Sequence, residues 1–258
     1  MDIFNVSLGG LTIEMKSRFD YLRLFCRGYL CDGSEPDFSV FATDEKIAEL
    51  RESNTEMADC FLERDAIFAE IASKLPYYNR MMLHGACITY NGKGYLFTAH
   101  SGTGKSTHIA LWKRFLGDSV GIVNGDKPIF EMRPDGTIHA YDTPWCGKEG
   151  WNEGKSADVA GICFLEQGTE NKIRKVDPEE AISLMLQQMF HPYETESTLL
   201  MLEMLSEMLS RLPMYLLECD MSEEAVKTSF EALTGERYRR SEHETTLEEI
   251  NRLWRMPK

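Results

Sequence analysis

Long apolar runs and basic character are both scarce in this sequence of 258 residues. No apolar run approaches the roughly 20 residues that a membrane-spanning helix needs, so we expect no membrane partner. Acidic residues outnumber basic ones by 42 to 28, which gives a formal net charge of −14. Such a charge repels polyanions, so the sequence also predicts no nucleic-acid partner.

Cysteine pairs are missing as well. The seven cysteines are an odd number, and no two of them have the CxxC spacing of zinc ribbons and thioredoxin-type redox sites. Unpaired thiols are typical of a reducing compartment. The first four residues, Met-Asp-Ile-Phe, lack the basic-then-apolar arrangement of a signal peptide. We therefore expect a cytoplasmic protein.

The chain has the composition of an ordinary globular protein, with 43% hydrophobic and 27% charged residues. No repeat, low-complexity segment or linker divides it. We expect an N-terminal α+β extension over residues 1–75 packed on a core over residues 76–234. A charged tail follows over residues 235–258.

The expected elements alternate between strands and helices. In the extension, strands are expected at 3–8, 11–15 and 38–41, and a helical pattern runs from 43 to 75, where Pro76 ends it. In the core, strands are expected at 83–90, 95–99, 120–123, 129–132, 137–141, 159–165 and 214–219, and helices at 107–116, 178–190, 197–212 and 222–233. Asn91-Gly92 predicts a hairpin. Because a doubly wound βαβ protein would usually lack that hairpin, the predicted fold class is mixed α and β.

The most informative motif is Ala-His-Ser-Gly-Thr-Gly-Lys-Ser-Thr at residues 99–107. It matches the phosphate-binding loop GxxxxGK[ST], except that Ala99 stands where the first glycine usually is. An expected strand precedes it and an expected helix follows it, which is the context that this motif requires. The predicted nucleotide-binding residues are Ser101, Gly102, Thr103, Gly104, Lys105, Ser106 and Thr107.

Each part of the loop has a chemical task. Gly102 and Gly104 let successive backbone N–H groups point at phosphate oxygens. Lys105 reaches the β and γ phosphates, and the Ser106 hydroxyl coordinates Mg²⁺. Asp126, at the end of the expected strand 120–123, is the best second ligand for the metal. The alternative is that Asp126 only belongs to a turn at the strand end.

Two further residues are candidates beside the loop. His84 opens the hairpin strand and could act as an acid, a base or a phosphate contact, or it could be structural. Lys148 lies in a glycine-containing loop with Trp145 and Trp151 and could contact phosphates, or it could be a solvated surface charge. The same loop could instead be pinned to the core by its tryptophans.

These motifs together resemble a known family. Leu83-His84-Gly85-Ala86, the loop at 99–107 and Asn124-Gly125-Asp126-Lys127 are similar to the catalytic domain of the HPr kinase/phosphorylase family, and more closely to a bacterial subgroup related to it. The resemblance covers residues 76–220. It implies the fold shared with ATP-dependent phosphoenolpyruvate carboxykinase, with mixed sheets around the phosphate loop.

The resemblance also implies an activity. An ATP-dependent phosphotransferase would move the γ-phosphate of ATP, or of another nucleoside triphosphate, to a serine or other hydroxyl of a peptide, protein or small molecule, with Mg²⁺. The catalytic residues would be Lys105, Asp126 and His84. One departure matters, because Gly125 replaces the first acid of the family's Asp-Asp pair. The base would then be Asp126, His84, Glu153 or another group, and Gly125→Asp would be expected to raise activity in a degenerate kinase.

Two other functions stay open. A nucleotide-binding regulatory protein could keep the loop and lose catalysis, which Gly125 favours. A carboxykinase-like enzyme ranks lower, because the chain has about half the length expected of that family and no Lys/His manganese pair is recognisable. The sequence gives neither the acceptor nor the physiological direction, and it leaves a homo-oligomer open.

Overall fold

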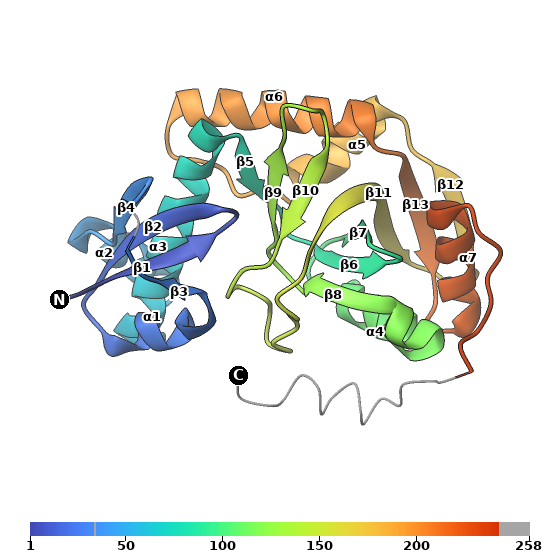
Figure 1. The fold of residues 1–258 in the computed structure, drawn as a ribbon, viewed down its shortest axis with the longest axis horizontal. Coiled ribbons are helices and arrows are strands. Elements are labelled where there is room, and N and C mark those ends of the chain that lie inside the picture. Colours follow the sequence, from blue (N-terminus) through green and yellow to red (C-terminus); the bar gives the residue numbers. More distant parts are fainter. Residues whose placement is uncertain (34, 243–258) are drawn as a thin grey trace.

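The computed structural model describes residues 1–33 and 35–242, so residue 34 and most of the expected charged tail, residues 243–258, lie outside it. Within this part of the chain, two sheets form side by side with helices around them (Figure 1). The fold class predicted from the sequence, mixed α and β, is confirmed.

The smaller sheet belongs to the N-terminal region and has the strand order β3-β1-β2-β4. Its elements are β1 (Asp2–Leu8), β2 (Leu11–Ser17), α1 (Asp20–Phe25), η1 (Arg27–Tyr29), β3 (Leu30–Cys31), β4 (Phe38–Phe41), α2 (Asp44–Ser53) and α3 (Asp59–Lys74). Alternate residues of β2 are buried, which is the pattern of a sheet with one covered face. That face packs against apolar residues of α3.

The larger sheet forms the core and has the order β5-β9-β10-β11-β7-β6-β8, with β13 paired to β11 and β12 paired to β13. Its elements are η2 (Leu75–Tyr78), β5 (Arg80–Met82), β6 (Ala86–Tyr90), β7 (Lys93–Thr98), α4 (Lys105–Leu116), η3 (Gly117–Ser119), β8 (Val120–Asn124), β9 (Ile129–Met132), β10 (Ile138–Tyr141), β11 (Ser156–Gln167), β12 (Lys172–Lys175), α5 (Pro178–Leu186), α6 (Thr195–Arg211), β13 (Met214–Cys219) and α7 (Glu223–Thr234).

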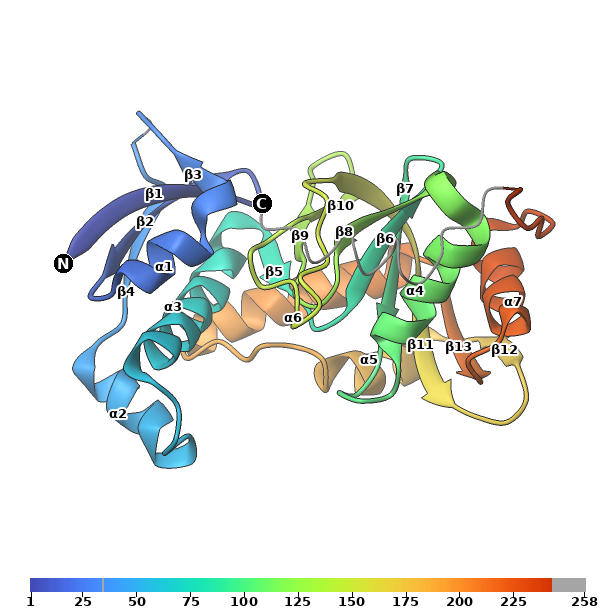
Figure 2. The same ribbon diagram turned by 90° about the horizontal axis from the view of Figure 1, so that it is seen from below.

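Helices cover both faces of this larger sheet. On β7, Leu96 packs with the cluster that includes α5 and α6, whereas Phe97 packs with the cluster that includes α4 and α7. On β11, Phe164 packs with the cluster that includes α5 and α6, and Cys163 packs with the cluster that includes α4 and α7. Burial on both faces explains why these strands are nearly continuous apolar runs. Figure 2 shows α6 along one side of the sheet and α4 along the other.

Several element boundaries differ from those expected. The helical pattern at 43–75 is broken into α2 and α3, and the chain continues through Pro76 as η2 to Asn79, which has the left-handed φ of 57°. The strand expected at 83–90 begins only at residue 86, because the backbone of His84 and Gly85 bonds to Gln188 and Asp126 instead of a neighbouring strand. Short elements that the sequence pattern missed are α1, β3, β5 and β12.

The two sheets share a hydrophobic core. Trp145, from the long loop between β10 and β11, packs against Phe25 of α1 and Phe68 of α3, with ring centroids 5.6 and 5.3 Å apart. Met82 and Ile129 of the larger sheet join the same cluster. No helix in the described part of the chain is long and apolar enough to cross a membrane.

Candidate phosphate-binding site

The phosphate loop connects the end of β7 to the start of α4. Gly102 and Gly104 have φ values of +84° and +118°, a backbone region that strongly favours glycine. Gly104 is the residue directly before the helix. The positive end of the α4 dipole and its free N–H groups therefore face the space beside the loop, an arrangement that favours anions.

Lys105 is folded back on this loop. Its Nζ donates a hydrogen bond to the carbonyl of Ala99 at 2.9 Å and lies 3.5 Å from the carbonyl of His100. The side chain is buried, and burial lowers the pKa of Lys105, although the negative charge of Asp126 acts in the opposite direction. The ammonium thus already lies where the loop turns.

Asp126 is held by a turn that follows β8. The Oδ1 atom of Asn124 accepts hydrogen bonds from the backbone N–H groups of Asp126 and Lys127, both at 2.8 Å. Asn124 is itself fully buried, and its Nδ2 donates to the Thr143 carbonyl at 3.0 Å. The sequence pattern did not single out Asn124 as a positioning residue. Its local signal is the Asn itself, because Asn side chains commonly bond to the backbone two residues further on in an Asx turn.

Two side chains contact the carboxylate of Asp126. His84 Nε2 lies 3.3 Å from Oδ1, and Lys127 Nζ pairs with Oδ2. Burial acts to raise the pKa of Asp126, but the hydrogen bonds and charges of His84 and Lys127 outweigh it and lower the pKa to about 2. Asp126 is therefore ionised at neutral pH and available as an oxygen ligand.

His84 is positioned from both sides of its ring. Its Nδ1 lies 2.9 Å from Gln188 Oε1, and its backbone N–H donates to the Gln188 carbonyl at 2.8 Å. Gln188 follows α5 and is 104 residues away in the chain. No local pattern in the sequence marks Gln188, because only the tertiary fold brings it to His84.

A cavity of about 440 Å³ brings most of the predicted residues together. Its walls include His84, Ser101, Gly102, Gly104, Lys105, Ser106, Thr107, Asp126 and Lys148. Thr103 lines the neighbouring cavity instead. Glu153, the remaining candidate base, is not among the lining residues and pairs with Lys155.

Gly125 fills a place where a side chain would not fit. A Cβ atom there would lie 2.9 Å from Trp151 Cβ and 3.0 Å from the carbonyl oxygen of Cys146. The Gly125 N–H also donates to the Trp151 carbonyl at 2.8 Å. The loop between β10 and β11 therefore occupies the space that an acid at position 125 would need.

The loop between β10 and β11 is pinned to the core at both ends of the segment that lines the cavity. Trp145 and Trp151 are each 6% exposed and pack into different hydrophobic clusters, so the loop is pinned by its tryptophans. Between them, Gly147 and Lys148 line the phosphate cavity. Pinning at both ends thus presents the intervening residues to the site.

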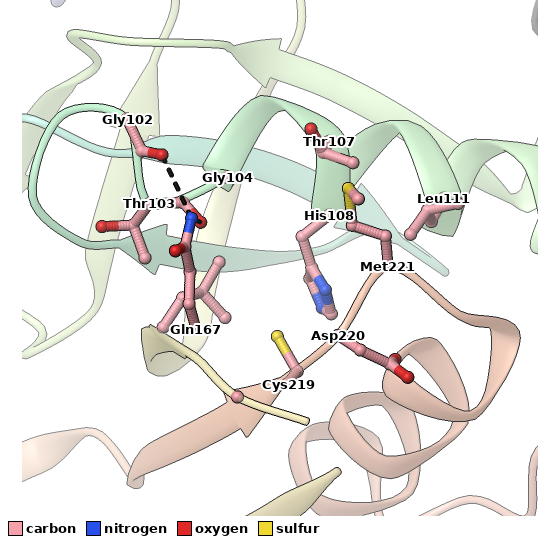
Figure 3. Close-up of a pocket in the computed structure, with 12 residues that line it drawn as sticks. Gly102, Thr103, Gly104, Thr107, His108, Leu111, Gln167, Cys219, Asp220 and Met221 are labelled. Atoms are coloured by element: carbon pink, nitrogen blue, oxygen red, sulfur yellow. Dashed lines mark hydrogen bonds between the residues drawn. The ribbon is translucent and has the colours of Figure 1, made fainter. Parts of the chain in front are cut away.

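A second cavity, of about 430 Å³, lies on the other side of the loop (Figure 3). It is lined by the loop, the first turns of α4 and the ends of β11 and β13. Gln167 Nε2 donates to the Thr103 carbonyl at 3.1 Å, which ties the loop to β11. His108, which lines this cavity, has Nε2 bonded to Ser229 at 3.0 Å, and burial lowers its pKa to about 3. His108 is therefore neutral, and its Nδ1 has no hydrogen-bond partner among the described residues.

The donor set suits a magnesium ion shared with phosphates. Ser106 and Asp126 line the same cavity and offer a hydroxyl and an ionised carboxylate. The described residues hold no cluster of three or more His, Cys, Asp or Glu side chains that could form a metal site by itself. Mg²⁺ typically uses one or two protein oxygens and completes its shell with water and substrate phosphates, so these two residues fit it.

Comparison with known proteins gives similar solved structures and one family. No curated protein matches the sequence. The Hpr(Ser) kinase/phosphatase from Coxiella burnetii is similar over 58% of this chain and 96% of that chain, with a TM-score of 0.31 and 12% identity. Nothing of that enzyme's chemistry is carried over at this level of likeness. The model of the family described as SynChlorMet cassette protein ScmC matches residues 47–228, more than two thirds of the sequence, and the chain therefore belongs to that family.

Proposed function

We propose that this protein is an ATP-dependent phosphotransferase that moves the γ-phosphate of a nucleoside triphosphate to a hydroxyl group. The observation that carries the proposal is the phosphate cavity, where the N-terminus of α4, Lys105, Ser106 and an ionised Asp126 face one space. Positive donors that surround phosphate oxygens beside a metal-binding carboxylate are the common requirement of phosphoryl transfer.

The two cavities beside the loop suggest how the nucleotide lies. Both are lined by Gly102, Gly104 and Thr107, so they meet at the loop. We assign the triphosphate to the polar cavity with Lys105 and Asp126. The nucleoside then occupies the cavity beside Leu111 and the neutral His108, whose free ring nitrogen could bond to it.

The chain's own residues would perform distinct tasks. Lys105 would exchange its carbonyl partners for the β and γ phosphate oxygens, and the α4 N-terminus would stabilise the same charges. Ser106 and Asp126 would hold Mg²⁺, which neutralises phosphate charge when bound. The acceptor hydroxyl would attack the γ-phosphorus and release its proton to water, while the bond to the β–γ bridging oxygen breaks and the diphosphate leaves. His84 would orient Asp126 for its task as a metal ligand.

The test measures binding and transfer separately. Calorimetry with ATP and Mg²⁺ reports binding, and γ-labelled ATP incubated with pools of peptides and small hydroxyl compounds reports transfer. In Lys105→Ala, we expect transfer at least about 100-fold slower, because one charge-stabilising donor is typically worth that much. The matched control is Lys93→Ala, an exposed lysine at the far end of β7, which should behave as the parent. Absence of nucleotide binding in the parent protein would refute the proposal.

A nucleotide-binding regulatory protein is the second candidate. It is favoured by the crowding at Gly125, which excludes the acid that the resembling kinases place there. The same experiment separates the two functions. The regulatory function would be identified if ATP binds but no phosphate reaches any pool. Lys105→Ala would then weaken ATP binding and change nothing else.

A further inference from the structure

A third cavity, of about 530 Å³, lies between the N-terminal region and the core. It opens beside the phosphate cavity, and it is lined from α1, α3, the end of β8, the loop after β10 and the segment after α5. No single stretch of the sequence builds this cavity. Its volume is within the range of about 300–1,000 Å³ typical of small-molecule sites.

Four aromatic rings form one part of its wall, and charged side chains, among them Arg64 and Asp65 of α3, form another. Phe25, Phe68, Trp145 and Phe190 all line it. Phe25 and Phe68 each contact Trp145, and Phe68 contacts Phe190 edge-to-face with centroids 4.6 Å apart. Phe25 and Phe190 are only partly buried, so their rings still have accessible area. A flat apolar ring is the ligand shape that such a wall accommodates best.

The aromatic cavity and the phosphate cavity meet at shared residues. Asp126, Gly147 and Lys148 line both. Lys127 lies at the same junction, because its ammonium pairs with Asp126 and lies 5.8 and 5.9 Å from the ring centroids of Phe68 and Phe190. A group held by the aromatic wall would thus have its polar end at Asp126.

The wall also contains an unsatisfied donor. The indole Nε1 of Trp145 is buried and has no hydrogen-bond partner among the described residues. Buried polar groups in native proteins are nearly always paired. An acceptor atom on a bound molecule is one partner that would satisfy this N–H group.

We infer that the aromatic cavity binds the phosphate acceptor, and that the acceptor is a small molecule with an aromatic ring and a hydroxyl, such as a phenol. This inference rests on the proposed phosphotransferase function and names its substrate class. The phenolic oxygen forms a bond to the γ-phosphorus, the bond from phosphorus to the bridging oxygen breaks with its electron pair on the diphosphate, and the phenolic proton is released to water. The products are an aryl phosphate and the nucleoside diphosphate.

The experiment compares probes with and without a ring. Tyramine and L-tyrosine carry the ring and hydroxyl, whereas ethanolamine and L-serine carry only the hydroxyl on a similar amine. With γ-labelled ATP and Mg²⁺, we expect label in the ring-bearing probes at a rate at least about tenfold above the ringless ones, since an aromatic contact can contribute that much. Saturation-transfer NMR with tyramine measures binding without turnover.

Two variants locate the binding. Phe190→Ala and Phe25→Ala each remove one partly buried ring from the wall and should weaken tyramine binding at least about fivefold. Phe61→Ala is the matched control, because Phe61 lies on α3 and is 38% exposed but does not line the cavity. Thermal unfolding identifies a variant that fails to fold. If Phe190→Ala or Phe25→Ala fails to fold, tyramine binding by the other of the two variants tests the cavity.

The outcomes separate the two proposals. If ATP binds and its phosphate reaches serine or a peptide as fast as tyramine, the aromatic acceptor is refuted and the phosphotransferase stands. Equal loss of tyramine binding in Phe61→Ala would also refute the assigned cavity. If ATP does not bind, the proposed function itself fails.

Discussion

The phosphate cavity and the aromatic cavity meet at Asp126 but are built in opposite ways. The phosphate cavity is centred on one stretch of chain, residues 101–107, with its two glycines and one buried lysine, and other segments add only a few polar and charged groups such as His84 and Asp126. The aromatic cavity relies on side chains that five separate segments bring together. The phosphate cavity can therefore be altered only through its few charged groups, whereas each ring of the aromatic cavity can be replaced without changing the backbone. The ligand preference of the aromatic cavity is therefore easier to change by substitution than that of the phosphate cavity.

The largest expected effect comes from Asp126, one of the residues that both cavities share. Asp126→Asn removes the charge that pairs with His84 and Lys127 and that would hold the metal. We expect phosphate transfer to fall at least about 1,000-fold, comparable to the loss of a principal charge-stabilising group. Single-turnover transfer from labelled ATP measures it. Asp118→Asn, at a fully exposed carboxylate, is the control, and a variant that kept a tenth of the activity would remove Asp126 from the mechanism.

The second prediction concerns the packing around Gly125, which lines the phosphate cavity. Gly125→Asp forces a Cβ to within 2.9 Å of Trp151 and buries a charge, so we expect the free energy of unfolding to drop by about 2–4 kcal/mol. Gly125→Ala should cost less, about 1–3 kcal/mol. Urea denaturation measures both.

The control for this pair is Gly28→Asp, where a Cβ would meet nothing within 4 Å. From the sequence alone, Gly125→Asp restores the acid pair, which would raise activity in a degenerate kinase and leave activity unchanged in a kinase whose base lies elsewhere. A stable Gly125→Asp protein with faster phosphate transfer would show that the loop between β10 and β11 can move to admit the side chain. It would contradict the explanation that crowding excludes an acid at position 125.

The smallest effect belongs to the exposed cation at the junction. Lys148 lines both cavities but stays exposed, so its charge is largely screened. Lys148→Ala should lower kcat/KM about three- to tenfold at low ionic strength and less at higher salt. Lys172→Ala, 69% exposed on β12, should change neither value. A salt-independent loss would mean that Lys148 acts through packing instead of charge.

The sequence predicted those features that depend on neighbouring residues. The strand, loop and helix around Lys105 and the hairpin at Asn91-Gly92 lie where the pattern placed them, because glycine conformation, periodicity and turn chemistry are local properties. The roles of Ser101 to Thr107, His84, Asp126 and Lys148 stay predictions that the experiments above address.

Features made by distant segments could not be predicted in this way. The contact of Gln188 with His84 joins residues 104 positions apart. The crowding at Gly125 depends on where the loop after β10 is pinned, and the aromatic cavity depends on how α1 and α3 pack against that loop. A pattern of neighbouring residues carries no information about contacts between residues that are far apart in the chain.

The crowding at Gly125 also constrains the order in which this sequence can change. An acidic side chain at this position crowds Trp151 and Cys146 while they keep their backbone path, so the substitution costs least after the loop has shortened or repacked. Changes in the loop alone would at first have no benefit for catalysis. Residue 125 and the loop between β10 and β11 are therefore coupled in evolution, and an acid that appears at position 125 first must be tolerated at a loss of stability.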